Sequence, residues 1–243
     1  MTGLNNMWQT QVNNIVRDIS VGIGKVSLIA LALFSTHAVA SAKEGETSNA
    51  AAAKAAKVRE AEELLSNLGY WITKVDGNSD DSTRQGIIAF QKVNGFSRTG
   101  VLDDRVLRAI RIATRPEAKH GGAAHVEIDI SRQVIFLVDD NGQVSKVLST
   151  STGNGERYFS EGKWQTAYTP RGTFKIQRQI KGIRKAVLGT IYYPSYFNGG
   201  IAIHGSNSIP VKAASHGCAR IPRFADKDFV NMVKVGMPVY VYD

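Results

Sequence analysis

Two periods of apolar residues divide the chain beyond its first fifty residues. Across residues 58–113 apolar side chains recur three and four positions apart in three short blocks, the spacing that places them on one face of a helix. From His125 onward the period changes to two, as Val126, Ile128 and Ile130 alternate with polar residues. Alternation of this kind is typical of half-buried strands. We therefore predict a small helical module followed by a mostly β domain.

Start and stop signals support three helices in the first of these regions. Side chains of Ser, Thr and Asp cap helix N-termini, and glycine ends helices because it adopts left-handed backbone conformations. Gly69 follows the first block, Ser82 or Thr83 is the predicted N-cap of the second, and Asp103 or Asp104 is the predicted N-cap of the third. The pattern predicts three helices that pack into one module.

The β region begins after residues 114–124, which contain one proline and two glycines and are predicted to act as a hinge. Asn141-Gly142 stands between two apolar runs, a strong hairpin signal. Further strands are predicted over Gly172–Gln179, Ile201–His204 and Val239–Tyr242, and one helix over Asp226–Val235. The fold class is therefore α+β in two domains, with a three-helix module before a mostly β, sandwich-like domain.

The first forty-two residues are predicted to be a signal peptide. Arg17 and Lys25 precede an uncharged stretch that ends in the small residues 38–42 (AVASA), which a signal peptidase accepts. An uncleaved membrane anchor is the alternative, although the 17 uncharged residues between Lys25 and Lys43 are few for a membrane span. Residues 43–56 lack an apolar period and are expected to form a solvated tether that becomes helical toward its end.

Charge and acidic clusters narrow the range of partners. The chain has 30 Lys and Arg against 21 Asp and Glu, a balance that favours anionic partners such as an acidic polymer, acidic lipid or nucleic acid. The basic run 175–185 lacks interleaved aromatic residues, so we interpret it as a solvated face. Residues 76–80 begin like a calcium loop, but Asp81 and Ile87 stand where that loop needs glycine and glutamate. We predict a polar loop there.

The single cysteine, Cys218, changes the functional interpretation most. Exported proteins usually pair their structural cysteines, so a lone cysteine is either a small buried hydrophobe or a thiol kept for its chemistry. Cys218 belongs to residues 215–220 (SHGCAR). This run begins ten residues after Gly205, the last residue of 203–205 (IHG). Imidazole can accept a thiol proton, and Gly217 lets successive N–H groups converge on an oxyanion. A zinc site of His204, His216 and Cys218, or a plain core cluster, remains open at this point.

These motifs resemble the active-site signature of the YkuD-type L,D-transpeptidase family. The resemblance is carried by residues 196–205 (YFNGGIAIHG) and 215–220, and upstream by 149–153 (STSTG) and 169–174 (TPRGTF). It covers essentially all of residues 125–243. Ala219 departs from the family pattern, which usually has a larger aliphatic residue there. Residues 58–112 are similar to the small helical peptidoglycan-binding domain, through Gly69-Tyr70, Asp76-Gly77, Thr83, Phe90-Gln91, Gly95, Thr99-Gly100 and Asp103.

The resemblance implies a cell-wall enzyme that needs no metal or cofactor and forms 3→3 cross-links between peptidoglycan stem peptides. Cys218 would attack a tetrapeptide donor, release its terminal D-alanine and form a thioester, which an amine of a neighbouring stem would resolve. His204 would be the general base, oriented by a carbonyl near Gly205 or by the Ser215 hydroxyl. Backbone N–H groups of His216, Gly217 and Cys218 would form the oxyanion hole.

The resemblance also implies substrate contacts and a location. The residues expected to bind substrate are Arg220, Tyr196, Asn198 and Gly205. The partners would be peptidoglycan stem peptides and the cell wall, without nucleic acid or a stable membrane span after signal cleavage. The protein would be a monomer in the periplasm or at the cell wall or extracellular face, with a part in cell-wall biogenesis and cell shape.

The expected boundaries are a signal peptide at 1–42, a tether at 43–56, a peptidoglycan-binding domain at 57–113, a linker at 114–124 and a catalytic domain at 125–243. Three other functions use the same residues or part of them. A cysteine L,D-carboxypeptidase or cross-link-cleaving peptidase would use the same site with water as acceptor. A pure wall-binding protein would need only the helical module, and a zinc hydrolase would use the two histidines and Cys218 as ligands.

Overall fold

The computed structural model describes the backbone of residues 30–243 and the side chains from residue 49 onward. Residues 52–243 form one compact unit, into which the helix α2 (Ala30–Asn67) leads. Residues 1–29 of the predicted signal peptide lie outside the described part. Within the described part, no helix combines the length and apolar character needed to cross a membrane.

The predicted tether at 43–56 lies inside α2 and is helical throughout. Its alanines explain the difference, because alanine has the highest intrinsic helix propensity and needs no apolar period to form a helix. The side chains of residues 49–57 are exposed.

The helical module contains the end of α2, α3 (Asp81–Val93) and α4 (Asp104–Ile112). Asp103 caps α4 by accepting a hydrogen bond from Val106 N at 2.7 Å, as predicted. The cap of α3 is Asp80, which accepts from Thr83 N at 2.8 Å, so the prediction of Ser82 or Thr83 was wrong. The Asp80 carboxylate reaches the N–H three residues ahead, which leaves Ser82 and Thr83 inside the first turn.

Glycine and a buried glutamate shape the connection between α2 and α3. Gly69 has φ 92° and stands in a Schellman turn, in which Tyr70 N donates to Leu65 O and Gly69 N donates to Ser66 O. The Glu62 carboxylate is buried and accepts hydrogen bonds from the N–H groups of Asp76 and Gly77, both at 2.9 Å. These bonds close the 76–80 loop from within the protein.

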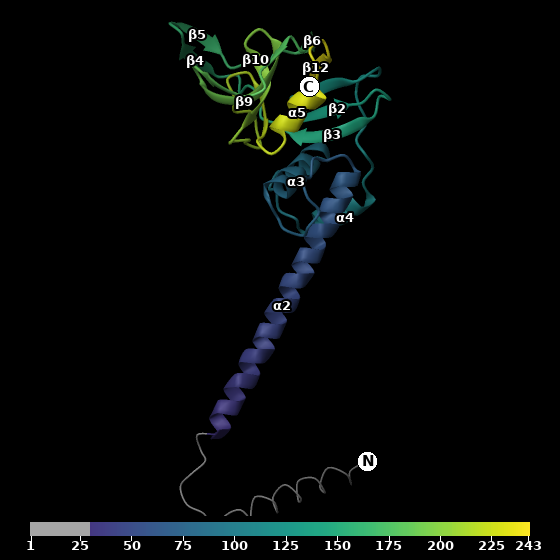
Figure 1. Ribbon diagram of the computed structural model, residues 1–243, viewed down its shortest axis with the longest axis vertical. Coiled ribbons are helices and arrows are strands. Elements are labelled where there is room, and N and C mark those ends of the chain that lie inside the picture. Colours follow the sequence, from purple (N-terminus) through teal and green to yellow (C-terminus); the bar gives the residue numbers. More distant parts are fainter. Residues whose placement is uncertain (1–29) are drawn as a thin grey trace, which may run out of the picture. The chain divides into compact units, whose positions relative to one another are not determined.

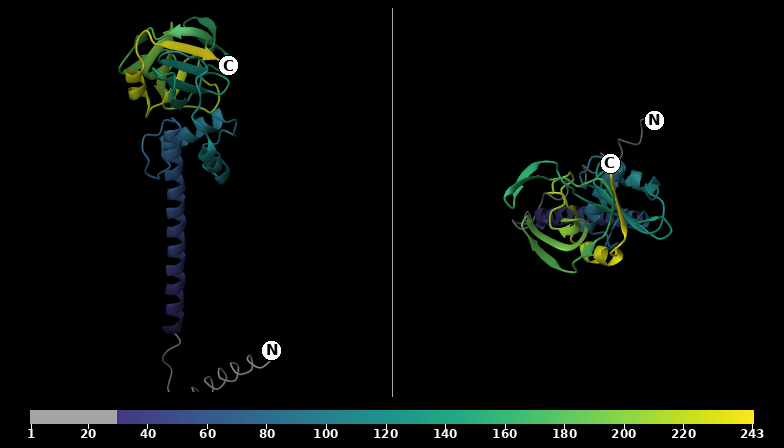
Figure 2. Two further views of the ribbon diagram at one scale, coloured as in Figure 1. Left: turned by 90° about the vertical axis from the view of Figure 1, so that its right-hand side faces the viewer. Right: turned by 90° about the horizontal axis from the view of Figure 1, so that it is seen from above.

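The β domain contains two five-stranded sheets and a separate hairpin. The first sheet has the order β3-β2-β1-β12-β6, and the second has β11-β10-β9-β7 with β8 paired to β9. The strands of the first sheet are β1 (His125–Asp129), β2 (Val134–Val138), β3 (Val144–Ser149), β6 (Gly172–Lys175) and β12 (Pro238–Tyr242). β12 is the last strand of the chain and lies parallel to β1 in this sheet (Figure 2).

The second sheet consists of β7 (Arg178–Gln179), β8 (Ile183–Ala186), β9 (Gly189–Asn198), β10 (Ile201–Ser206) and β11 (Ala219–Pro222). The hairpin is β4 (Arg157–Ser160) with β5 (Lys163–Thr166), and the helix α5 is Asp226–Met232. The predicted strands, the Asn141-Gly142 hairpin and the α+β class are confirmed, and the last helix ends at Met232, three residues earlier than predicted.

The main core lies between the two sheets and includes α5. Ile128 and Val239 of the first sheet, Phe197 and Ile203 of the second, and Phe229 of α5 are all fully buried in it. Ala219 is also buried there, so the small side chain that departs from the family pattern stands at a packed position.

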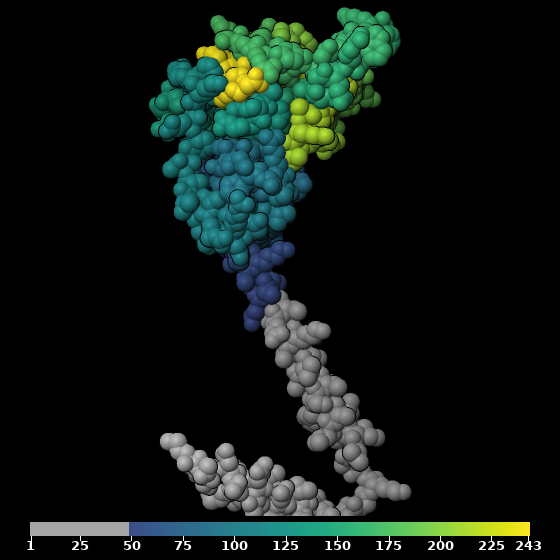
Figure 3. All heavy atoms as spheres, turned by 180° about the vertical axis from the view of Figure 1, so that it is seen from behind, coloured from purple at the N-terminus to yellow at the C-terminus, as the bar shows by residue number. Residues whose placement is uncertain are grey.

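A second core joins the helical module to the opposite face of the first sheet. Tyr70 and Phe90 of the module pack with Phe136 of β2 and Val147 of β3, and every residue of β2 is buried. The module also extends the sheet edge, because Trp71 N donates to Val147 O at 3.1 Å and Val147 N donates to Gly69 O at 2.8 Å. Figure 1 shows α3 against β3, and Figure 3 shows the module and the strands as one continuous surface.

The predicted hinge at 114–124 is held at several points, so this prediction was wrong. Arg115 donates to Val144 O at 2.9 Å and also to Asn67 O. The backbone N–H groups of Lys119 and His120 donate to the buried carboxylate of Glu127. Proline and glycine indicate where a chain turns, but they do not show whether the elements on either side share a core.

Candidate active site

The loop that carries the cysteine closes on itself through the Ser215 side chain. Ser215 Oγ donates to Cys218 O at 2.5 Å and accepts from Gly217 N at 3.0 Å. Gly217 has φ 134°, and a Cβ added there would lie 3.0 Å from Tyr168 O. A glycine is therefore required at this position, both for the backbone conformation and for the close approach of a neighbouring strand end.

Two threonines outside the loop hold it through hydrogen bonds. Thr169 Oγ1 donates to Gly217 O at 2.6 Å and accepts from Gly153 N at 2.9 Å. Ser215 N donates to Thr152 O at 2.9 Å. The sequence indicates these threonines only through the family resemblance, and their hydrogen bonds follow from the folded structure alone.

Cys218 is a free, half-buried thiol at the start of β11. Its Sγ accepts a hydrogen bond from Ala202 N at 3.4 Å, which places the sulfur beside β10. Burial raises the pKa of the Cys218 thiol, while the Ala202 N–H and the positive charge of Arg220 oppose the rise in pKa. The thiol is therefore protonated at neutral pH, and nucleophilic attack requires a neighbouring base.

His204 lies on β10 and is buried, with 5% of its surface exposed. Its Nδ1 is 2.9 Å from Gly205 O. A carbonyl oxygen only accepts, so Nδ1 carries the ring proton and Nε2 keeps a lone pair. Burial lowers the pKa of His204, the Gly205 carbonyl opposes this, and the charge of Arg220 lowers the pKa further. The ring is thus a neutral base at pH 7.

Strand register brings these two groups to neighbouring positions in the second sheet. β10 and β11 are parallel, with Ile203 opposite Ala219 and His204 opposite Arg220. Because side chains alternate along a strand, Ile203 and Ala219 point into the core, whereas His204 and Arg220 lie on the other face. Cys218 adjoins Ala219, the first residue of β11, and its Sγ lies beside Ala202, two positions before His204 on β10. The positive charge of Arg220 lowers the pKa of both His204 and Cys218, which is consistent with this placement.

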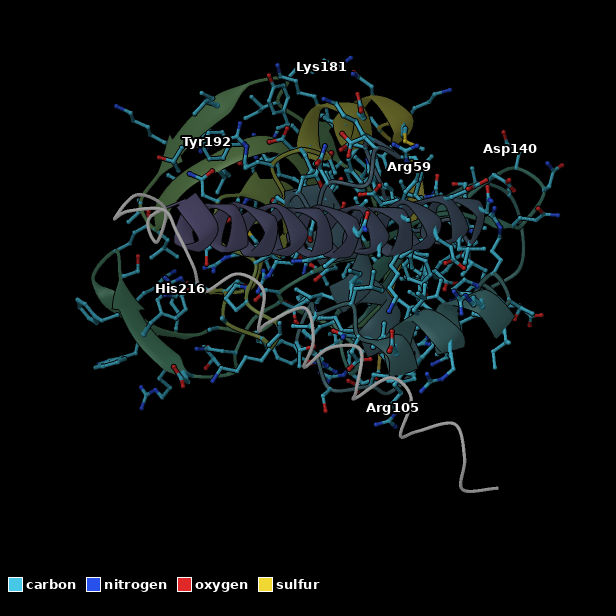
Figure 4. The ribbon with its side chains drawn as sticks, turned by 90° about the horizontal axis from the view of Figure 1, so that it is seen from below. Arg59, Arg105, Asp140, Lys181, Tyr192 and His216 are labelled. Atoms are coloured by element: carbon cyan, nitrogen blue, oxygen red, sulfur yellow. The ribbon has the colours of Figure 1, made fainter. Side chains whose placement is uncertain are left out.

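His216 occupies a different environment, although it is only two residues from the cysteine. Its side chain is exposed, and its ring packs edge-to-face on Tyr158 of β4, with ring centroids 4.6 Å apart. Figure 4 shows His216 beside the β4–β5 hairpin. The ring therefore contacts the hairpin, and nothing like the Gly205 carbonyl fixes its tautomer in the described structure.

The oxyanion hole predicted from the sequence needs one correction. Gly217 N already donates to Ser215 Oγ, so it does not point at a substrate oxygen. Among the described residues, the structure gives no hydrogen-bond acceptor to the backbone N–H groups of His216 and Cys218. These two N–H groups are the remaining candidates from the predicted set of three.

The residues predicted to bind substrate have different positions. Arg220 is half-exposed on β11, and Asn198 is half-buried at the turn between β9 and β10. Tyr196 is 4% exposed, and the guanidinium of Arg178 lies 3.9 Å from its ring centroid. Its ring offers almost no surface to a substrate, so the binding role predicted for Tyr196 is not supported.

Gly205 acts through its backbone and its small size. A Cβ at this position would overlap the side chain of Asp226, which is buried and pairs with Arg223 at 2.6 Å. The Gly205 carbonyl, and not the Ser215 hydroxyl, orients the His204 ring. The two alternatives left open by the sequence are resolved in favour of the carbonyl.

A metal site of three ligands was the other open interpretation. In the part of the chain that the structure describes, no group of three or more His, Cys, Asp and Glu side chains is arranged to hold a metal ion.

Comparisons with known proteins agree with this geometry. The model of the L,D-transpeptidase catalytic domain family matches residues 123–241, and that of the peptidoglycan binding domain matches residues 54–110. The chain is similar to the crystal structure of an L,D-transpeptidase from Xylanimonas cellulosilytica, with 36% identity and a TM-score of 0.71 over 76% of this chain and 92% of that chain.

Two further similarities are more distant. An L,D-transpeptidase from Stackebrandtia nassauensis has 23% identity and a TM-score of 0.44 over 76% of this chain and 90% of that chain. One from Mycobacterium smegmatis has 20% identity and a TM-score of 0.41 over 51% of this chain and 60% of that chain. No curated protein matches the chain.

Proposed function

The chain belongs to the L,D-transpeptidase family, and from this membership we propose that it forms 3→3 cross-links in peptidoglycan through a thioester on Cys218. Its two domain types indicate peptidoglycan as the substrate and the cell wall or periplasm as the place of action. The observation that supports the proposal most is the placement of the two groups on the parallel strands β10 and β11: the Cys218 thiol lies beside Ala202, and the buried His204 imidazole stands two positions further along the same strand.

In the first half-reaction, His204 Nε2 takes the proton of the Cys218 thiol as sulfur attacks the carbonyl carbon after the third residue of a tetrapeptide stem. The N–H groups of His216 and Cys218 stabilise the oxyanion that forms. When the intermediate collapses, the carbon–nitrogen bond to D-alanine breaks. The His204 imidazolium returns its proton to the leaving nitrogen, which leaves a thioester and D-alanine with a free amine.

In the second half-reaction, an amine of a neighbouring stem attacks the thioester. His204 accepts a proton from that amine, the carbon–sulfur bond breaks, and the thiolate of Cys218 recovers the proton. The Gly205 carbonyl holds the ring in one tautomer through both steps. The positive charge of Arg220 lowers the pKa of both His204 and Cys218. We expect its guanidinium to attract a carboxylate of the substrate.

The decisive experiment is the incubation of the purified protein with tetrapeptide stems, followed by separation and mass analysis of the products. The proposal predicts 3→3 dimers together with free D-alanine, and both should disappear in Cys218→Ala. Tripeptide stems without dimers would instead identify a carboxypeptidase that uses water as acceptor. Metal analysis of the same preparation tests the zinc hydrolase alternative.

We also propose that the chain is exported and cleaved after Ala40 or Ala42, so that the mature protein begins at Ser41 or Lys43. The proposal rests on the apolar segment that precedes these residues and on a substrate found outside the cytoplasmic membrane. N-terminal sequencing of the exported protein tests it. An intact Met1 in a membrane fraction would support the anchor.

A further inference from the structure

Lys92 of the helical module is a buried ammonium group inside the interface with the β domain. It lies on α3 with 2% of its surface exposed. Its Nζ donates to Gln133 O at 3.0 Å, to Ser149 Oγ at 2.8 Å and to Thr150 O at 2.8 Å. All three acceptors belong to the β domain, so a single side chain of the module binds three points of its neighbour.

The need for a stable interface does not account for a lysine at this position. The acceptors are uncharged oxygens, and burial together with the charge of Arg98 lowers the pKa of Lys92 to about 7. A buried cation without an opposite charge is costly, and an apolar side chain of similar length is often tolerated as well or better in such a place. The surrounding contacts, such as Phe90 on Val147, are already apolar.

The acceptors of Lys92 lead directly to the catalytic loop. Two of them, Ser149 Oγ and Thr150 O, lie at the start of the run 149–152, whose Thr150 Oγ1 donates to Arg220 O at 2.8 Å. Ser151 and Arg220 exchange backbone hydrogen bonds at 3.1 and 3.4 Å. Thr152 O accepts from Ser215 N at 2.9 Å. The run 149–152 therefore holds the chain on both sides of Cys218.

Gln133 reinforces the same run. It has φ 61°, a left-handed conformation that a residue with a side chain rarely adopts. Its carbonyl accepts from both Lys92 Nζ and Thr150 N, and its amide exchanges hydrogen bonds with Thr152 N and Thr152 Oγ1 at 2.9 and 2.7 Å. A strained residue whose carbonyl and side-chain amide are all hydrogen-bonded is typical of structure that positions a functional site.

We propose that Lys92 is a positioning residue for Cys218: through this ammonium group, the helical module sets the position of the run 149–152 and, with it, the alignment of the sulfur with His204. The module is then a working part of the catalytic domain as well as a candidate wall-binding unit. The inference rests on the proposed function only in taking Cys218 as the nucleophile.

The test compares Lys92→Met with the matched control Arg115→Met. Arg115 also ties the module to β3, but at Val144 O, the end of that strand away from the catalytic loop. Two rates are measured in folded protein: kcat for cross-linking, and alkylation of the thiol by iodoacetamide. The chain has one cysteine, so alkylation reports Cys218 alone. It needs no substrate and is therefore independent of the proposed function.

We expect Lys92→Met to lower both rates by about 10- to 100-fold with KM unchanged, the size of effect that a small misplacement of a catalytic group produces. Arg115→Met should lower the melting temperature and leave both rates at the wild-type value. Wild-type rates in folded Lys92→Met, or an equal loss in both variants, would overturn the inference.

A second variant breaks the hydrogen bond between the run 149–152 and β11. Thr150→Val keeps the shape of the side chain and removes the hydroxyl that donates to Arg220 O. It should reproduce the loss of alkylation, and the double variant with Lys92→Met should lose less than the product of the two single effects. If Lys92→Met does not fold, Thr150→Val decides alone. If the variants alkylate slowly but no protein forms cross-links, the proposed function fails and the positioning role stands.

Discussion

The end of strand β10 and the loop before β11 each bring one histidine to the neighbourhood of Cys218, and the two are not equivalent. His204 is buried, bonded through Nδ1 to Gly205 O, and has a lowered pKa. His216 is exposed and packs on Tyr158. The difference teaches that a histidine close to the cysteine in sequence is not thereby suited to act as its base. A strand end in the protein interior fixes the tautomer and keeps the ring neutral, whereas an exposed loop does neither.

The largest expected effect in this comparison comes from Cys218→Ala, which removes the thiol for which both histidines are candidate bases. Cross-linking and covalent labelling by a carbapenem, an acylating inhibitor expected from the family resemblance, should both be abolished. Intact-protein mass spectrometry checks the labelling. The thermal melt should stay close to that of the wild type, because Sγ makes only long hydrogen bonds at 3.4 and 3.9 Å. Any residual adduct would place the nucleophile elsewhere.

His204→Ala should slow acylation by about 10²- to 10⁴-fold, the usual contribution of a general base. Stopped-flow measurement with a carbapenem gives this rate directly. His216→Ala, measured in the same way, is the matched control, since it removes an imidazole two residues from the same sulfur. Acylation at the wild-type rate in His204→Ala, with a folded but inactive His216→Ala, would show that the base has been misassigned.

Ser215→Ala should have an intermediate effect. The hydroxyl makes two hydrogen bonds inside the loop, to Cys218 O and from Gly217 N, and leaving such buried groups unpaired costs about 1–3 kcal/mol. We expect a lower melting temperature together with slower acylation, and a His204 whose pKa is unchanged. A changed His204 pKa, measured by NMR titration, would return the orienting role to the serine.

His216→Ala should produce a smaller loss that comes mainly from structure. Its ring makes one edge-to-face contact with Tyr158, and such aromatic pairs contribute about 0.5–1.5 kcal/mol. The melting temperature should fall slightly, and the rate should fall less than in His204→Ala. Tyr158→Leu should reproduce the change in stability, because it removes the same contact from the hairpin side. A melting temperature equal to that of the wild type in both variants would show that the contact between His216 and Tyr158 does not stabilise the protein.

The smallest expected effect is a displacement of the pH profile. The folded-state pKa of His204 lies below 6.5 because burial disfavours the charged ring. The ring is therefore still a base at pH 6.5, and the acid limb of kcat/KM should lie below that pH. The lowered pKa of His204 also makes the free energy of unfolding depend on pH. As the pH falls below 6.5, the His204 ring takes up a proton more readily in the unfolded chain than in the folded protein, so the folded protein becomes less stable. A limb at or above pH 6.5 would contradict the buried, neutral ring.

Much of the fold follows from local patterns. The change of period from helical spacing to alternation separates the module from the β domain, and Asn141-Gly142 and Asp103 have the predicted turn and cap positions. The hinge prediction failed for a physical reason. Residues 114–124 contain turn-forming residues, yet Phe90 and Phe136 on either side of them share one core. Local chemistry does not reveal a contact between residues far apart in sequence.

For the site, the residues alone made Cys218 and His204 candidates and left a zinc site or a core cluster open, because spacing does not show which groups meet in space. The resemblance of residues 196–205 and 215–220 to a family signature favoured the nucleophile. Tertiary structure decided the rest. The Gly205 carbonyl fixed the tautomer of His204, the Ser215 hydroxyl accepted the hydrogen bond of Gly217 N, and Arg178 covered the Tyr196 ring. Lys92 is the strongest example. In sequence it is one polar position on a helix, and its buried bonds to residues 41, 57 and 58 positions further along the chain exist only because the folded chain brings them together.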